Sequence, residues 1–228
     1  MGLRLVHPVL YFLLLALLPL PFGGNTLWAW PLLALLNTVI FWKLLDNPAR
    51  YNSIHIPKTE CALLLQRCMP TIIALTLVQL WVLIQIVSGM SLATSDSFVA
   101  FIKGMSLLVF FVNSLIILKD PRNLKLSVYV VIVSAGFQAA YGSFMVLSGI
   151  EYGFFIEKEH YRNVATGTFI NRNHLASYLT MSISIGLGYI LSYRDSQSRG
   201  WRHTLRNTLA FIISDRFLIR LVLISLAI

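Results

Sequence analysis

The residues best suited to chemistry lie in one short stretch, Thr166–Ala176, directly before an apolar run. This stretch holds Asn171, Arg172, Asn173 and His174 in succession. An asparagine before a helix accepts hydrogen bonds from the unpaired N–H groups of the first turn. Those N–H groups and the helix dipole attract anions, and a guanidinium binds phosphate through two parallel hydrogen bonds. The stretch therefore predicts a phosphate or diphosphate site.

Two further residues belong to the predicted site. Arg162 lies ten residues before Arg172 and can supply a second guanidinium, and Gly167 allows a close backbone approach or a tight turn. Simpler roles stay open for the same residues. Arg172 can extend to the lipid headgroups, Asn171 can serve only as a helix cap, and His174 can be an interfacial or packing histidine.

Several classes of protein are excluded by what the chain lacks. It has no HExxH, Walker, GxSxG or CxxC motif, so we expect no metal, no nucleotide cofactor and no serine nucleophile. Its two cysteines, Cys61 and Cys68, are too few for a disulfide framework. The net charge of +9 is spread between hydrophobic runs, which argues against nucleic acid as a partner.

The elements that position the stretch are expected to be membrane-spanning helices. The chain is 57% hydrophobic and 12% charged, whereas soluble domains are about 45–50% apolar and about 25% charged. Runs of roughly 20 apolar residues can cross a bilayer. We predict an all-α fold, a polytopic transmembrane helical bundle forming a single membrane domain over residues 1–228. It has six complete spans, with a truncated seventh starting near Phe217: Leu5–Pro21, Leu27–Leu45, Pro70–Val87, Phe98–Leu118, Leu126–Leu147 and Leu175–Tyr193.

Polar residues outside the predicted site are expected to have structural roles. Asn113, Ser114, Gln138 and Tyr141 are isolated within the spans and are expected to form hydrogen bonds between helices rather than to a ligand. The segment Lys58–Cys68 suits either a short interfacial helix or an ordinary polar connector.

The basic residues predict the orientation. If the N-terminus is cytoplasmic, fourteen of the 18 Lys and Arg residues fall in cytoplasmic segments, and four lie toward the other side: Lys103, Lys158, Arg162 and Arg172. This asymmetry follows the positive-inside rule. The predicted phosphate site is then at the face of the membrane opposite the cytoplasm.

The sequence from Gly167 to Ala176, Gly-Thr-Phe-Ile-Asn-Arg-Asn-His-Leu-Ala, resembles the Gly-Thr-Phe-x-Asn-x-Asn signature of the O-antigen ligase and polymerase superfamily of bacterial envelope proteins. Residues 160–228 look like the start of the ligase-like region. The resemblance implies a multi-pass protein of the bacterial inner (cytoplasmic) membrane, which transfers a glycan from an undecaprenyl diphosphate carrier at the periplasmic face. The acceptor that the resemblance implies is lipid A core or a polysaccharide. Its implied partners are membrane lipids, the undecaprenyl-diphosphate-linked glycan and the glycan acceptor, with no cofactor.

The sequence also differs from the pattern of this family. The arginine that often precedes Gly-Thr-Phe is absent, since Thr166 stands there, and Arg162 can substitute only at an offset. Family members have more spans, so we expect this chain to be the N-terminal part of a larger protein. The catalytic residues are expected beyond residue 228, and the chain alone is expected to be inactive.

Two other functions remain open from the sequence. A transporter or flippase of lipid-linked sugars needs ionisable groups near mid-membrane, and the predicted spans are almost free of them. A non-catalytic remnant is the third hypothesis. The choice between ligase and polymerase, the sugar and the acceptor are left open.

Overall fold

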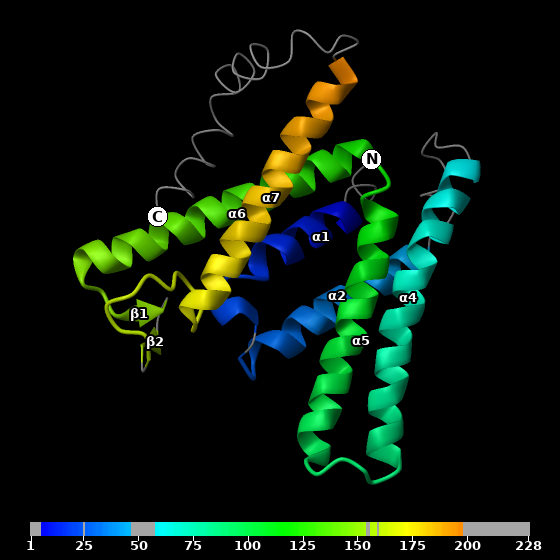
Figure 1. Cartoon of the computed structure of the whole chain (residues 1–228), viewed down its shortest axis with the longest axis horizontal. Helices are drawn as coiled ribbons and strands as arrows, with labels where there is room; N and C mark the ends of the chain where they lie inside the picture. The colour runs from blue at the N-terminus through cyan, green and yellow to red at the C-terminus, as the bar shows by residue number, and fades with distance from the viewer. Residues whose placement is uncertain (1–5, 25, 47–57, 154–155, 159, 198–228) are drawn as a thin grey trace. The chain divides into compact units, whose positions relative to one another are not determined.

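The computed structural model describes residues 6–24, 26–46, 58–153, 156–158 and 160–197, which are mostly helical (Figure 1). The two short strands pair antiparallel, with Tyr152 opposite Glu157 and Gly153 opposite Ile156. In chain order the elements are α1 (Val6–Leu17), the 3-10 turn η2 (Phe22–Gly24), α2 (Ala29–Asp46), α4 (Lys58–Val87), α5 (Thr94–Ile117), α6 (Pro121–Ser148), β1 (Tyr152–Gly153), β2 (Ile156–Glu157) and α7 (Arg172–Gln197).

Five of the described helices, α2 and α4 to α7, are long and apolar enough to cross a membrane. Each overlaps one of the predicted spans. The prediction of an all-α fold with several helices suited to crossing a membrane is therefore confirmed for the described residues. The count of six complete spans is not confirmed, and the predicted seventh span lies outside these residues.

The first predicted span, Leu5–Pro21, is shorter in the structure. Helix α1 has 12 residues and ends at Leu17, two residues before Pro19. A proline disfavours helical backbone in the residue before it and has no N–H of its own. The chain turns there instead, with hydrogen bonds from Leu20 N to Leu17 O (3.0 Å) and from Gly23 N to Pro19 O (3.2 Å).

The segment Lys58–Cys68 is helical but is not a separate element. Helix α4 begins at Lys58 and runs without a break to Val87, with Pro70 in its interior. The expected short helix therefore forms the first turns of α4.

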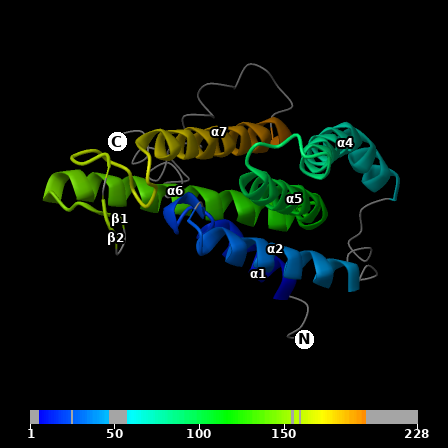
Figure 2. The same ribbon diagram turned by 90° about the horizontal axis from the view of Figure 1, so that it is seen from below.

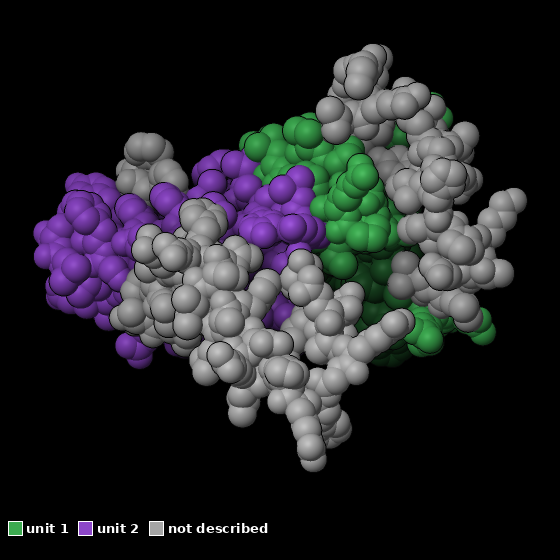
Figure 3. All heavy atoms as spheres, turned by 90° about the horizontal axis from the view of Figure 1, so that it is seen from above, with its two compact units in different colours: residues 1–14, 30–124 green, residues 15–29, 125–228 purple. Residues whose placement is uncertain are grey.

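The described chain divides into two compact units (Figure 3). Unit 1 contains residues 1–14 and 30–124, and unit 2 contains residues 15–29 and 125–228.

In unit 1, α4 and α5 lie side by side as an antiparallel hairpin (Figures 1 and 2). Gly104 of α5 allows this close approach, because a side chain there would overlap the amide of Gln79 on α4. The turn between the helices contains Gly89 at a φ of 68° and a hydrogen bond between the hydroxyls of Ser91 and Ser97 (2.6 Å).

Polar side chains join the other helices of unit 1. Asn113 of α5 donates from Nδ2 to the backbone carbonyl and to Oδ1 of Asn37 on α2, at 3.0 and 2.9 Å. Asn37 in turn donates to the carbonyl of Ser106 at 2.7 Å, and the hydroxyls of Ser114 and Tyr11 are 2.9 Å apart. The expectation that Asn113 and Ser114 bond between helices is thus confirmed.

In unit 2, α7 crosses α6 (Figures 1 and 2). Val128 and Ile132 of α6 are buried there, with Tyr129 and Tyr189 packed against them. The rings of Tyr129 and Tyr189 meet edge to face, with centroids 6.5 Å apart.

The buried asparagine pair of unit 1 is expected to stabilise the bundle. Asn37→Ala and Asn113→Ala should each lower the free energy of unfolding by about 1 kcal/mol. The double variant should show a coupling of about 0.6–1.7 kcal/mol, measured by unfolding in mixed micelles. Thr38→Ala is the matched control, because the Thr38 hydroxyl donates to Ala34 O of its own helix. Strictly additive effects at positions 37 and 113 would contradict the pairing.

Candidate functional site

The first half of the predicted stretch is buried against α6. Thr166 and Thr168 are 0% and 1% exposed, and Phe169 is also buried. Gln138 of α6 makes two hydrogen bonds with Thr168: Nε2 donates to the hydroxyl at 2.7 Å, and Oε1 accepts from the backbone N–H at 2.9 Å. The Thr168 hydroxyl donates to the carbonyl of Pro19 at 2.8 Å. We call Gln138, Thr168 and Pro19 the glutamine clamp.

Gly167 makes the clamp possible. Its φ is +57°, and a Cβ atom there would lie 2.6 Å from Gln138 Oε1 and 3.1 Å from the Gln138 carbonyl. On α6, Gly142 faces this segment, since a Cβ at Gly142 would lie 3.4 Å from Gly167 N. The close approach predicted for Gly167 is therefore made to α6, and a role toward a ligand stays a prediction.

The second half of the stretch starts α7 as predicted. Asn171 caps the helix: its Oδ1 accepts from Asn173 N at 2.8 Å, and its carbonyl accepts from His174 N at 3.0 Å and Leu175 N at 3.3 Å. Because Asn171 itself pairs with these amides, an anion at this helix start must be held mainly by side chains. Arg172, Asn173 and His174 are all exposed and are placed to supply them.

The two arginines of the predicted site have different surroundings. The guanidinium carbon of Arg172 lies 6.0 Å from the centre of the Tyr161 ring, a cation–π contact. Arg162 donates from Nε to the carbonyl of Lys158 at 3.2 Å and pairs with Glu157 at 3.5 Å. Both partners of the Arg162–Glu157 pair are more than half exposed, so this ion pair stabilises little and can exchange for another anion.

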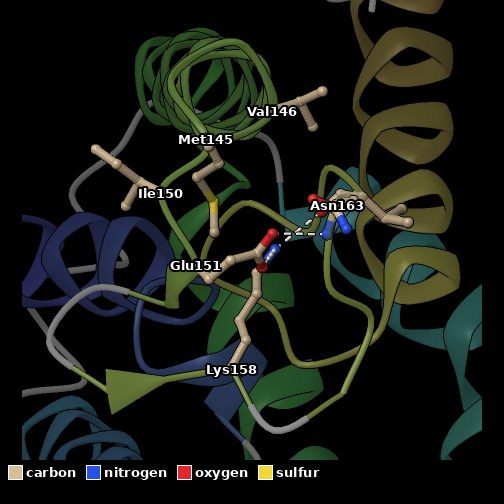
Figure 4. A pocket seen from close by; sticks show the side chains of 8 residues that line it. Met145, Val146, Ile150, Glu151, Lys158 and Asn163 are labelled. Carbon is tan, nitrogen blue, oxygen red and sulfur yellow. Dashed lines mark hydrogen bonds and ion pairs between the residues drawn. The ribbon is translucent and has the colours of Figure 1, made fainter.

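The loop that carries Tyr161 and Arg162 is held by a partly buried ion pair, and Figure 4 shows the two residues of this pair, Glu151 and Lys158. The side chain of Lys158 is 8% exposed, and its Nζ lies 3.8 Å from Glu151 Oε2 and donates to the carbonyl of Val164 at 2.9 Å. Glu151 Oε1 accepts from the backbone N–H of Asn163 at 2.6 Å. These groups line a cavity of about 50 Å³. The Glu151–Lys158 pair therefore joins the end of α6 to both sides of the loop.

Sequence reasoning missed the Glu151–Lys158 pair and the partner of Gln138. Glu151, Glu157 and Lys158 lie close together in the sequence, and nothing in their spacing indicates which carboxylate the lysine meets. For Gln138 the signal was present, since a lone amide in an apolar span must find a partner. Its expected bonding within the protein is confirmed, but the partner is a loop rather than a helix.

An apolar groove runs beside the clamp in unit 2. It encloses about 580 Å³. Its lining comes from the chain around the end of α1 and from the first half of α6: Ala16, Leu20, Leu126, Tyr129, Val130, Val133, Ser134 and Phe137. Pro19 and Gln138 of the clamp are next in sequence to Leu20 and Phe137. The groove can accommodate a hydrocarbon chain.

The fold and the site define a protein of long apolar helices, in which a polar loop is buried on one helix and starts the next with exposed basic and amide side chains. No protein-family model, curated protein or solved structure matches the chain.

The tight fit at Gly167 is testable against a second glycine. Gly149 has a φ of +68° but no neighbour within 4 Å of an added Cβ. Gly149→Ala should therefore cost only the backbone strain, about 1 kcal/mol of unfolding free energy. Gly167→Ala should cost about 2–4 kcal/mol, because it adds a clash with Gln138. Equal losses of stability in the two variants would show that the clamp is not tightly packed.

The Glu151–Lys158 pair predicts a pH effect. Burial lowers the pKa of Lys158 below the ordinary lysine value of 10.5, and attraction to Glu151 opposes this only in part. Between the lowered pKa and 10.5 the unfolded chain binds more protons at this residue than the folded chain. The contribution of Lys158 to stability should therefore rise as the pH rises through that window.

Nuclear magnetic resonance of isotopically labelled lysine is expected to give a titration midpoint for Lys158 below 10.5. The Lys158→Met variant assigns the signal. A midpoint at or above 10.5 would refute the lowering of the Lys158 pKa by burial.

Proposed function

We propose that the chain belongs to an inner-membrane, O-antigen ligase-related enzyme, which transfers a glycan from an undecaprenyl diphosphate carrier to lipid A core or a polysaccharide. The observation that carries the proposal is the exposed guanidinium of Arg172 in the first turn of α7, held against Tyr161 by a cation–π contact. With the N-terminus in the cytoplasm, this helix start faces the periplasm.

The chemistry of the helix start suits a diphosphate. Arg172 supplies a forked donor, and the positive end of the α7 dipole adds to its attraction for an anion. Asn173 and His174 follow on the same exposed turn and can donate further hydrogen bonds. Arg162 can contribute a second guanidinium by leaving Glu157. Asn171 acts first as the cap that sets the direction of the turn.

The apolar groove supports a lipid-linked substrate. A polyprenyl chain needs an apolar surface within the membrane, and the groove on α6 is lined almost entirely by hydrocarbon. The clamp connects this part of α6 to the segment that leads into Arg172. One substrate with a hydrocarbon chain and a diphosphate matches both features.

In the proposed reaction an acceptor hydroxyl attacks the anomeric carbon of the carrier-linked sugar. A new glycosidic bond forms, the bond from that carbon to the diphosphate oxygen breaks, and the acceptor hydroxyl loses its proton to solvent. The leaving polyprenyl diphosphate needs stabilisation of its negative charge, which is the role proposed for Arg172.

Removing the guanidinium should weaken diphosphate binding. In the full chain in detergent, Arg172→Gln is expected to lower the affinity for farnesyl diphosphate by about tenfold or more, because a charge-assisted hydrogen bond is lost. Calorimetry at low ionic strength measures the change, and added salt should weaken binding to the wild-type chain. Lys119→Gln, which removes a positive charge between α5 and α6, is the control and should bind normally.

Unchanged affinity in Arg172→Gln would contradict the assignment. The orientation can be tested with Asn173→Cys in a chain lacking Cys61 and Cys68. A membrane-impermeant maleimide should label it from the periplasmic side, and labelling only from the cytoplasm would defeat the proposal.

A further inference from the structure

The backbone at Tyr161 is unusual for an aromatic residue. Its φ is 56°, in the left-handed region that glycine and asparagine adopt most easily, and Asn163 two residues later has a φ of 58°. A loop that needed only a turn would be less strained with glycine at position 161. Strained residues of this kind cluster at ligand-binding sites, where the surrounding structure holds them in place.

Two hydrogen bonds hold this loop in its strained form. Glu151 accepts from the backbone N–H of Asn163 at 2.6 Å, and Lys158 donates to the Val164 carbonyl at 2.9 Å (Figure 4). Both bonds come from the Glu151–Lys158 pair, and the lysine is nine-tenths buried. The position of Tyr161 is thus fixed from both sides of the loop.

The ring of Tyr161 remains available to a ligand. The residue is 38% exposed, and the guanidinium of Arg172 lies 6.0 Å from the ring centre. An aromatic ring carries negative charge on its faces, which attracts the weakly positive C–H groups of a sugar ring. A flat apolar surface next to a phosphate-binding cation matches a sugar joined directly to a phosphate.

We infer that Tyr161 is a specificity-determining residue, which stacks against the sugar ring next to the diphosphate while Arg172 binds the phosphate. This inference rests on the proposed function and adds to it that the site recognises a glycosyl diphosphate, rather than any polyprenyl diphosphate.

Two probes separate sugar recognition from phosphate recognition. Farnesyl diphosphate carries only the phosphates, and glucosyl-diphospho-farnesol adds one sugar. The full wild-type chain should bind the sugar-bearing probe about three- to tenfold more tightly, the range expected of an aromatic contact. The ratio of the two affinities is the decisive readout, because a residue that only orients Arg172 would change both affinities equally.

Tyr161→Gly is the main variant, because glycine adopts the observed backbone without strain and should leave the fold intact. It should reduce the ratio to about one, whereas Tyr161→Phe should keep it, since the ring is retained. Tyr152→Leu removes another exposed tyrosine, on β1, and should leave the ratio unchanged.

The outcomes distinguish the two proposals. If neither probe binds to the wild-type chain, the proposed function fails. If both bind equally to the wild-type chain, or if Tyr161→Gly keeps the preference, the diphosphate site stands and the role of Tyr161 is overturned.

Discussion

Non-helical backbone inside a membrane protein persists only where its N–H and C=O groups find partners, because neither lipid nor a packed interior supplies water. The segment before α7 meets this condition through Gln138. One primary amide provides both an acceptor for the Thr168 N–H and a donor for the Thr168 hydroxyl, which leaves the hydroxyl proton for Pro19. A leucine at position 138 would leave the buried Thr168 N–H unpaired, at a cost of about 1–3 kcal/mol, and would leave the hydroxyl only its bond to Pro19.

The position of the site follows from this contact. Thr168 is only three residues before Asn171, so fixing Thr168 on α6 restricts where α7 can begin. Asn171 then closes the first turn with its own side chain and carbonyl. Arg172, the first residue after this cap, is exposed. The buried half of the stretch therefore positions the exposed half.

The sequence predicted the helices better than it predicted their partners. Apolar runs located α2 and α4 to α7, since the length of a span depends only on local composition. The prediction failed for the length of α1, where Pro19 ends the helix although the residues around it are apolar.

The cap at Asn171 is a local interaction and was predictable for that reason. The clamp joins Gln138 to Thr168, 30 residues apart, and the asparagine pair joins Asn37 to Asn113, 76 residues apart. Such pairings depend on how helices cross, which composition does not encode.

The Glu151–Lys158 pair illustrates what a partly buried charge pair contributes. Taking two charges out of water costs about as much as their attraction returns, so the pair is a weak source of stability. The pair instead favours one conformation of the loop over the others. The lysine also bonds to Val164 O and the glutamate to Asn163 N, so any loop conformation that moved residues 163 and 164 would leave these partly buried charges without the two hydrogen bonds. The free-energy cost of these lost hydrogen bonds applies to the alternative loop conformations and not to the observed one. The left-handed backbone at Tyr161 can therefore persist because relaxing it would remove hydrogen bonds from two partly buried charges.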